Sequence, residues 1–168
     1  MKVLGIVGWS GSGKTTLLTA LLPLLRGRGL TVSTVKHTHH GFDMDRPGKD
    51  TFRHREAGAL EVLVASGTRW ALLHELDGPE PRLPELLARM QPVDLVLVEG
   101  FKTHPFAKLE VHRPALGKPP IWHTEPDIAA VAVDAPLASC DRTLLPLNDP
   151  AAVAGWLLQF LALEQRAL

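Results

Sequence analysis

Short apolar runs alternate with segments of helical periodicity along this chain. Residues 3–7 form an almost continuous apolar run, which is typical of a strand buried on both faces of a parallel sheet. Apolar residues then recur at helical spacing from Leu17 to Leu25, and Gly27 ends that segment. The order of strand, glycine-rich loop and helix predicts the first crossover of an α/β protein.

The same alternation continues to the end of the chain. Two apolar segments flank a Ser-Gly-Thr turn, which indicates an antiparallel hairpin. Helices are predicted after Asp50, Pro84 and Asp149, because Asp can cap a helix and Pro suits its first turn. We therefore expect helices on both faces of a mostly parallel twisted sheet that carries an antiparallel hairpin. The further strands are predicted over residues 31–35, 61–65, 69–73, 93–98, 108–112 and 128–133.

Composition and charge favour one ordinary globular domain over residues 1–168. Lysine plus arginine equals aspartate plus glutamate at 18 each, so no net positive field attracts nucleic acid or an anionic membrane. The longest apolar stretch, residues 17–25, is well below the roughly 20 residues that cross a bilayer. We expect no targeting segment, and the single cysteine, Cys140, fits a reducing compartment such as the cytoplasm.

The clearest candidate chemistry lies between the first strand and the first helix. Residues 8–15 read Gly-Trp-Ser-Gly-Ser-Gly-Lys-Thr and fit G-x-x-x-x-G-K-[ST] at every specified position. Glycines let successive backbone N–H groups turn inward around a β-phosphate, at the positive end of the helix. We expect Lys14 to bridge the β- and γ-phosphates, Thr15 to bind Mg²⁺ and Thr16 to face the α-phosphate. The fold class is therefore the α/β P-loop NTPase three-layer fold, and the phosphate-binding candidates are Gly8, Trp9, Ser10, Gly11, Ser12, Gly13, Lys14, Thr15 and Thr16.

A carboxylate at the end of a buried strand supplies the second half of such a site. Glu99 lies there, at the edge of the sheet where open α/β folds bind their ligands. It can hold Mg²⁺ or orient an attacking water, so Lys14 and Glu99 are the catalytic candidates. Asp50 is a further metal candidate, with a helix cap as its alternative role, and Asp94 is interpreted as a turn residue. The metal-binding candidates are thus Thr15, Glu99 and Asp50.

A polar, basic loop over residues 36–49 follows the second strand. Its three histidines, His37, His39 and His40, suggest a metal, but the loop has no cysteine and no Cys-x-x-Cys spacing for structural zinc. We expect hydrogen bonds to a phosphate or an anionic partner instead, because arginine forks and lysines nearby bind phosphate. A solvated polar loop is the alternative. The ligand-binding candidates outside the phosphate loop are Lys36, His37, Arg53 and Lys102.

Four segments together resemble one known family. They are residues 8–15, Lys-His-Thr-His-His at 36–40, Pro-Gly-Lys-Asp at 47–50 with residues 53–59, and Glu-Gly-Phe-Lys at 99–102. Their order and spacing resemble the molybdopterin-guanine dinucleotide biosynthesis adaptor family, MobB. The resemblance implies that the nucleotide is GTP, that its hydrolysis is weak and that the chain forms a homodimer. It also implies a molybdenum cofactor guanylyltransferase, which joins GMP to molybdopterin, as a partner, with molybdopterin itself as a second one.

No motif indicates which purine base the chain binds, because the sequence contains no Asn-Lys-x-Asp. Asp134 follows a predicted strand, where it either reads the base edge or is a turn residue before Pro136. The leading hypothesis is an adaptor that binds GTP and Mg²⁺ and is at most a slow GTP hydrolase, since no arginine finger is evident. The alternatives are a small-molecule kinase, which uses the same loop, and a metallochaperone-type GTPase that uses the histidines.

Overall fold

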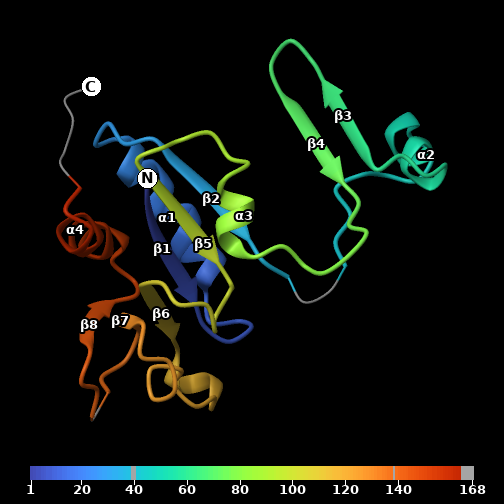
Figure 1. Ribbon diagram of the computed structural model, residues 1–168. Helices are drawn as coiled ribbons and strands as arrows, with labels where there is room; N and C mark the ends of the chain where they lie inside the picture. Colours follow the sequence, from blue (N-terminus) through green and yellow to red (C-terminus); the bar gives the residue numbers. More distant parts are fainter. Residues whose placement is uncertain (39–40, 138, 164–168) are drawn as a thin grey trace. The chain divides into compact units, whose positions relative to one another are not determined.

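The computed structural model describes residues 1–38, 41–137 and 139–163, which fall into two compact units (Figure 1). One unit comprises Met1–His37 and Gln91–Leu168, and the other comprises Thr38–Met90. The expectation of a single domain stays a prediction, because compactness by contacts does not test whether either unit folds alone.

The first unit is built on a six-stranded sheet in the order β2-β5-β1-β6-β7-β8. Every neighbouring pair in this sheet is parallel, so the carboxyl ends of its strands meet at one edge. This arrangement confirms the predicted α/β class. The strands are β1 (Lys2–Val7), β2 (Val32–Lys36), β5 (Leu95–Glu99), β6 (Lys108–His112), β7 (Ile128–Val133) and β8 (Thr143–Pro146).

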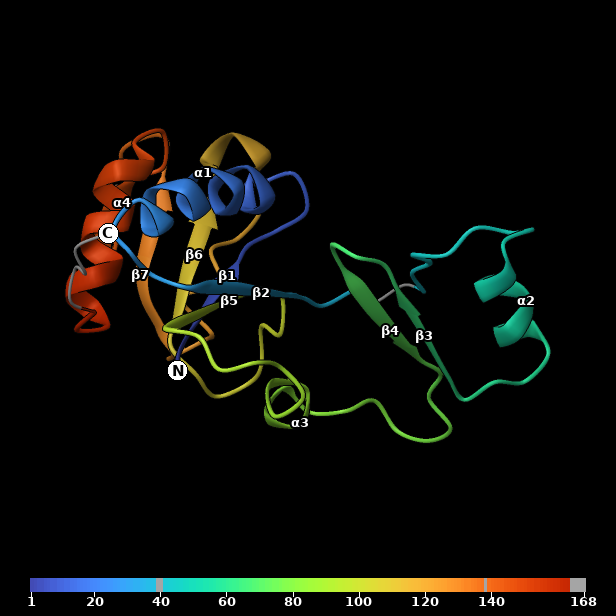
Figure 2. The same cartoon turned by 90° about the horizontal axis from the view of Figure 1, so that it is seen from above.

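Helices α1 (Lys14–Arg26) and α4 (Pro150–Phe160) lie side by side along one face of this sheet (Figure 2). Leu21 of α1 and Leu157 of α4 are fully buried in the main core with alternate side chains of the central strands. As predicted, Asp149 caps α4: its carboxylate accepts hydrogen bonds from the backbone N–H groups of Ala151 and Ala152 at 3.1 Å each. The apolar stripe on each helix is therefore the side that packs against this face of the sheet.

The opposite face of the sheet carries a row of buried polar side chains on β6. Lys108, Glu110 and His112 are at most 5% exposed, although ionisable residues are rarely buried. The Glu110 carboxylate accepts the backbone N–H groups of Ile121 and Trp122 at 2.9–3.1 Å. Burial raises the pKa of Glu110 above its usual value, and those two N–H groups act in the opposite direction. The loop after the short helix η1 (Pro114–Leu116) therefore packs on this face, where the Glu110 carboxylate binds its backbone.

The second unit contains α2 (Asp50–Glu56), the hairpin of β3 (Glu61–Ala65) and β4 (Trp70–His74), and α3 (Leu83–Leu87). The predicted hairpin is present and forms a sheet of its own. Asp50 was expected to cap a helix, but it lies inside the first turn of α2 and Lys49 is the cap residue. Asp50 lacks the extended backbone that a capping side chain needs to reach back to the first N–H groups.

Strand β8 was not predicted from the sequence. It has four residues, lies at the edge of the sheet and ends in Pro146, which cannot donate a ladder hydrogen bond. Its apolar content is too short to separate it from a loop by periodicity. No helix in the described part of the chain is long and apolar enough to cross a bilayer.

Candidate functional site

The loop between β1 and α1 can exist only with glycines at its turning points. Gly8, Gly11 and Gly13 have positive φ angles of 154°, 80° and 99°. A Cβ atom on Gly8 would lie 2.5 Å from the Val111 carbonyl oxygen and 2.6 Å from Ser12 Oγ. The cap residue of α1 is Gly13, which has no side chain to accept the first-turn N–H groups, so these groups are suited to bind an anion. Ser10 lies within this loop and Thr16 in that first turn.

Lys14 folds back across the loop that carries it. Its Nζ atom donates hydrogen bonds to the carbonyl oxygens of Gly8, at 3.1 Å, and Trp9, at 3.0 Å. Burial lowers the pKa of Lys14, and the ammonium groups of Lys102 and Lys36 act in the same direction, whereas Glu99 opposes them. A concentration of three ammonium groups beside one loop is suited to an anionic ligand of high charge, such as a triphosphate.

Thr15 and Glu99 meet at the carboxyl end of β5. The Thr15 hydroxyl donates to the two carboxylate oxygens of Glu99 at 3.0 and 3.2 Å. Glu99 is only 9% exposed, and Lys36, its register neighbour on β2, places Nζ 4.0 Å from the carboxylate. A hydroxyl and a carboxylate are the hard oxygen donors that Mg²⁺ prefers. These two side chains therefore fit a magnesium ion, which would neutralise phosphate charge at this point.

The turn after Glu99 is packed against His37. The His37 backbone N–H donates to the Glu99 carbonyl at 2.8 Å, and its ring stacks on Phe101 with 4.2 Å between ring centroids. A Cβ atom on Gly100 would lie 2.8 Å from His37 Cβ, so this approach requires glycine. Lys102 places its ammonium 4.4 Å from the centroid of the Trp9 ring, which connects this turn to the phosphate loop.

Arg113 is part of this site, although the sequence did not single it out. Its Nε donates to the carbonyl oxygen of Ser12 at 3.0 Å, and another guanidinium nitrogen binds the Asp134 carboxylate. Arg113 directly follows β6 and Asp134 directly follows β7, so both lie at the edge of the sheet that carries the phosphate loop. A basic residue just after a predicted strand was the signal that could have found it.

The remaining predicted residues lie in the second unit or outside the described part of the chain. Asp50 and Arg53 are on α2, where their side chains are 89% and 76% exposed and pair at 4.0 Å, so their role toward the ligand stays a prediction. His39 and His40 lie outside the described residues. Within residues 1–38, 41–137 and 139–163, no three His, Cys, Asp or Glu side chains are grouped to hold a metal.

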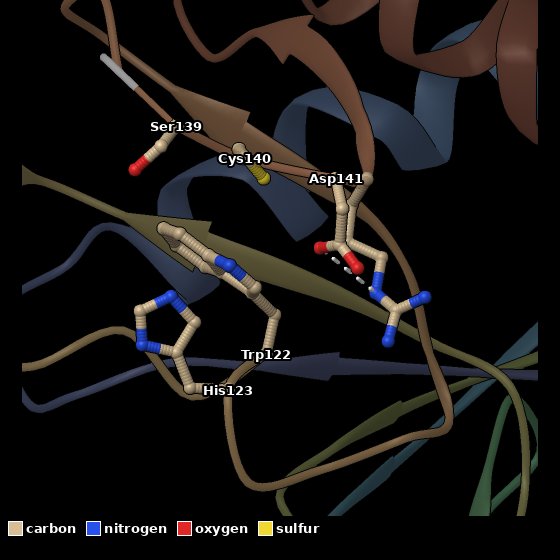
Figure 3. A pocket seen from close by; sticks show the side chains of 6 residues that line it. Trp122, His123, Ser139, Cys140 and Asp141 are labelled. Carbon is tan, nitrogen blue, oxygen red and sulfur yellow. Dashed lines mark ion pairs between the residues drawn. The ribbon is translucent and has the colours of Figure 1, made fainter.

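A hollow of about 610 Å³ is lined by residues outside the phosphate loop (Figure 3). Arg142, one of its lining residues, pairs with Asp141 across 3.7 Å. Trp122 and Cys140, which also line it, pack against the apolar cluster of Val7, Ile128 and Val131. The hollow therefore lies on the sheet face opposite α1 and α4.

A parallel α/β sheet, with a glycine loop at its first crossover and a buried carboxylate at the end of the neighbouring strand, defines a protein of the P-loop NTPase fold class. Residues 3–134 match the family model of molybdopterin guanine dinucleotide synthesis protein B, MobB. The chain belongs to this family, which confirms the resemblance found in the sequence.

Named relatives match almost the whole chain. A molybdopterin-guanine dinucleotide biosynthesis adapter protein of Escherichia coli (strain K12) is 42% identical over 165 residues, which is 96% of this chain and 94% of that protein. The protein of the same name from Haemophilus influenzae is 43% identical over 164 residues, or 96% of this chain and 90% of its own.

Solved structures agree with the fold. A crystal structure of molybdopterin-guanine biosynthesis protein B superposes with a TM-score of 0.75 at 28% identity, covering 95% of this chain and 99% of that one. The MobB homologue of Bacillus stearothermophilus gives a TM-score of 0.69 at 27% identity, covering 96% and 99% of the two chains.

Proposed function

We propose that this protein is a GTP-binding adapter of molybdenum cofactor biosynthesis. It binds GTP with Mg²⁺ at the phosphate loop and assists a guanylyltransferase in attaching GMP to molybdopterin. The observation that carries the proposal is the Thr15–Glu99 pair beside Lys14, since it joins hard oxygen donors to a phosphate-binding loop. The names of the relatives from Escherichia coli and Haemophilus influenzae supply the pathway.

Each residue of the site has a defined task in this proposal. The N–H groups of the loop and of the first turn of α1 bind phosphate oxygens, and Lys14 neutralises their charge. Thr15 and Glu99 hold the magnesium ion, with Lys36 beside them and Lys102 beside Trp9. Arg113 reaches the loop but donates to Ser12 and Asp134, so hydrolysis is expected to be slow at most.

The phosphate-binding role is tested first by replacing Lys14 with alanine. Loss of its ammonium removes a charge-assisted contact, so affinity for Mg-GTP should fall at least about a hundredfold in titration calorimetry. Lys2→Ala is the matched control, because Lys2 is exposed at the opposite end of β1. Equal GTP affinity in the Lys14 variant and the control would contradict the proposal, and wild-type titrations with ATP and without Mg²⁺ would establish base and metal dependence.

An exposed apolar surface supports the homodimer that family membership suggests. By the register of β3 and β4, Leu63, Trp70 and Leu72 lie on one face of the hairpin. Their exposed fractions are 62%, 65% and 44%. Clustered apolar side chains on a soluble domain mark an association surface, and a second copy of the chain would cover this one.

The kinase and metallochaperone hypotheses remain open to direct tests. A phosphorylated product formed from a metabolite mixture and ATP or GTP would favour the kinase. Stoichiometric metal retained by untagged protein, and lost on replacing His37, His39 and His40, would favour the metallochaperone. The cytoplasmic location also stays a prediction.

A further inference from the structure

The hollow on the sheet face opposite α1 and α4 has the size of a small-molecule site. Its volume of about 610 Å³ lies within the roughly 300–1,000 Å³ of pockets that enclose drug-sized ligands. Its walls come from two successive loops of the first unit, one between η1 and β7 and one between β7 and β8. The residues that line it are Trp122, His123, Ser139, Cys140, Asp141 and Arg142.

One wall of the hollow is aromatic and fixed in place. Trp122 is only 6% exposed, its backbone N–H donates to the Glu110 carboxylate at 2.9 Å, and its ring meets the His112 ring edge to face. The exposed His123 ring lies at 76° to the Trp122 ring, with 5.0 Å between the centroids. Aromatic side chains held in this way suit a flat heteroaromatic ligand.

The other wall carries one charge of each sign. Asp141 is 74% exposed, and its carboxylate lies 3.7 Å from Arg142 Nε, which is longer than a hydrogen bond. Within the part of the chain that the structure describes, Arg142 Nε is a buried donor that makes no hydrogen bond. Figure 3 shows the Asp141 carboxylate across the hollow from the Trp122 and His123 rings. An acceptor with two oxygens and a donor therefore lie side by side opposite the aromatic wall.

A pterin ring has the edge that matches this wall. It presents an amino group, a ring N–H and a carbonyl oxygen in one plane, so two N–H groups can donate to one carboxylate and the carbonyl can accept from a guanidinium. We propose that this hollow binds a pterin, with the ring against Trp122 and His123 and its polar edge on Asp141 and Arg142. The inference rests on the proposed function and extends it to molybdopterin, the second ligand of the attachment step.

One loop reaches both the hollow and the phosphate loop. Trp9 of the phosphate loop donates its indole N–H to the Pro119 carbonyl at 2.7 Å, and Trp122 lines the hollow three residues further along the same segment. The residues that line the hollow are not those of the phosphate site, so the first unit can hold a nucleotide and a pterin together. Pterin binding must therefore persist when GTP is bound.

The test is equilibrium dialysis of the full chain against free pterin, which is detected by its own fluorescence, without and with saturating Mg-GTP. Pterin should bind one to one, and Mg-GTP should change its affinity by less than about threefold. GTP carries the same polar edge on its guanine, so this result separates pterin from guanine and the hollow from the nucleotide site. Displacement of pterin by GTP would overturn the inference.

Two exposed residues of the hollow provide variants that do not put folding at risk. Asp141→Asn removes the charge of the acceptor and should weaken pterin binding at least about tenfold, whereas His123→Ala should weaken it about threefold or more. Mg-GTP affinity, measured by calorimetry, should stay within about twofold in both variants. Asp77→Asn is the matched control, because Asp77 is exposed and belongs to the second unit.

The outcomes separate this inference from the proposed function. A wild-type protein that binds Mg-GTP but retains no pterin would overturn the inference alone, as would wild-type pterin affinity in both variants. Failure to bind Mg-GTP would instead refute the proposed function, and dialysis without nucleotide would still decide whether the hollow takes a pterin.

Discussion

At the scale of single residues, the site depends on a carboxylate that is nearly inaccessible to water. Glu99 is 9% exposed and its oxygens are bound by the Thr15 hydroxyl, with the Lys36 ammonium 4.0 Å away. Burying a carboxylate costs free energy unless the group is paired. Thr15 and Lys36 therefore stabilise Glu99 at this buried position. The arrangement makes Glu99 the residue whose replacement should separate metal-dependent from metal-independent binding.

Glu99→Gln keeps the shape of the side chain and removes its charge. We expect Mg-GTP affinity to fall about tenfold to a hundredfold, because a charge-assisted interaction contributes about 1.5–3 kcal/mol. The smaller affinity for GTP in the presence of EDTA should change little. The measurement is titration calorimetry under both conditions, with the exposed Asp77→Asn as a control. If Mg²⁺ enhances GTP binding equally in both variants, Glu99 does not hold the ion.

At the scale of elements, strand β6 alternates apolar and polar residues, but both sets of side chains are buried. Leu109 and Val111 face the helical core, as their apolar character predicts. Lys108, Glu110 and His112 face the other way, and such residues would normally indicate a solvated face. Lys108 is buried beside Phe106, where its ammonium donates to the His104 carbonyl. Glu110 and His112 contact the loop after η1, whose N–H groups at residues 121 and 122 donate to the Glu110 carboxylate and whose Trp122 ring lies against His112. Local periodicity contains no information about that distant loop.

The same limit explains which elements and site residues the sequence revealed. Short apolar runs predicted β1 and β7, and glycines with Lys14 and Thr15 predicted the phosphate loop, because those signals are local. Arg113 was missed, since its partner Ser12 lies 101 positions away and only the sheet order brings them together. Residues that act through tertiary contacts thus escape sequence reasoning that relies on neighbouring positions.

Removing the Glu110 carboxylate should destabilise the first unit. Glu110→Ala leaves the Ile121 and Trp122 N–H groups without an acceptor, at a cost of about 1–3 kcal/mol for each unpaired buried group. Glu110→Gln keeps one acceptor oxygen and should cost less. Urea unfolding followed by circular dichroism measures both free energies of unfolding. A Glu110→Ala variant as stable as wild type would show that this loop finds other partners.

The same carboxyl group should give unfolding a characteristic pH dependence. Burial raises the folded-state pKa of Glu110 above the usual 4.5, so ionisation is less favourable in the folded chain. Its contribution to stability is fully present below about pH 4.5 and is lost as pH rises through the raised pKa. Glu110→Gln should lack this component. The free energy of unfolding is measured against pH for wild type and for Glu110→Gln, and the difference between the two curves gives the contribution of Glu110. Parallel curves would argue against the raised pKa.

At the scale of the whole molecule, the hairpin of the second unit has an exposed apolar face. Leu63 and Leu72 face each other across β3 and β4, and Trp70 lies on the same face. Leu63 and Trp70 are more than half exposed and Leu72 is 44% exposed, although apolar side chains of this size are usually buried. A second chain that packs against this face would remove these side chains from water. Their burial would stabilise the association by about 25 cal/mol for each Å² of apolar surface.

Leu63→Lys with Leu72→Glu should therefore weaken the proposed homodimer. Charged side chains at these positions would lose their hydration on association, so the equilibrium should shift toward monomer by at least about tenfold. Sedimentation velocity over a range of concentrations measures the shift. Thr68→Lys, in the turn between the two strands, is the control. A dimer that tolerates both changes, or a wild-type protein that is monomeric throughout, would exclude this face as the interface.

Trp9 gives the phosphate loop a built-in optical probe. Its indole N–H donates to the Pro119 carbonyl at 2.7 Å, and its ring lies under the Lys102 ammonium. The fluorescence of Trp9 therefore depends on how close the Pro119 carbonyl and the Lys102 ammonium are to its ring. A protein whose other tryptophans are replaced by phenylalanine would emit from inside the phosphate loop alone. Stopped-flow fluorescence could then time the arrival and departure of a nucleotide without any attached dye.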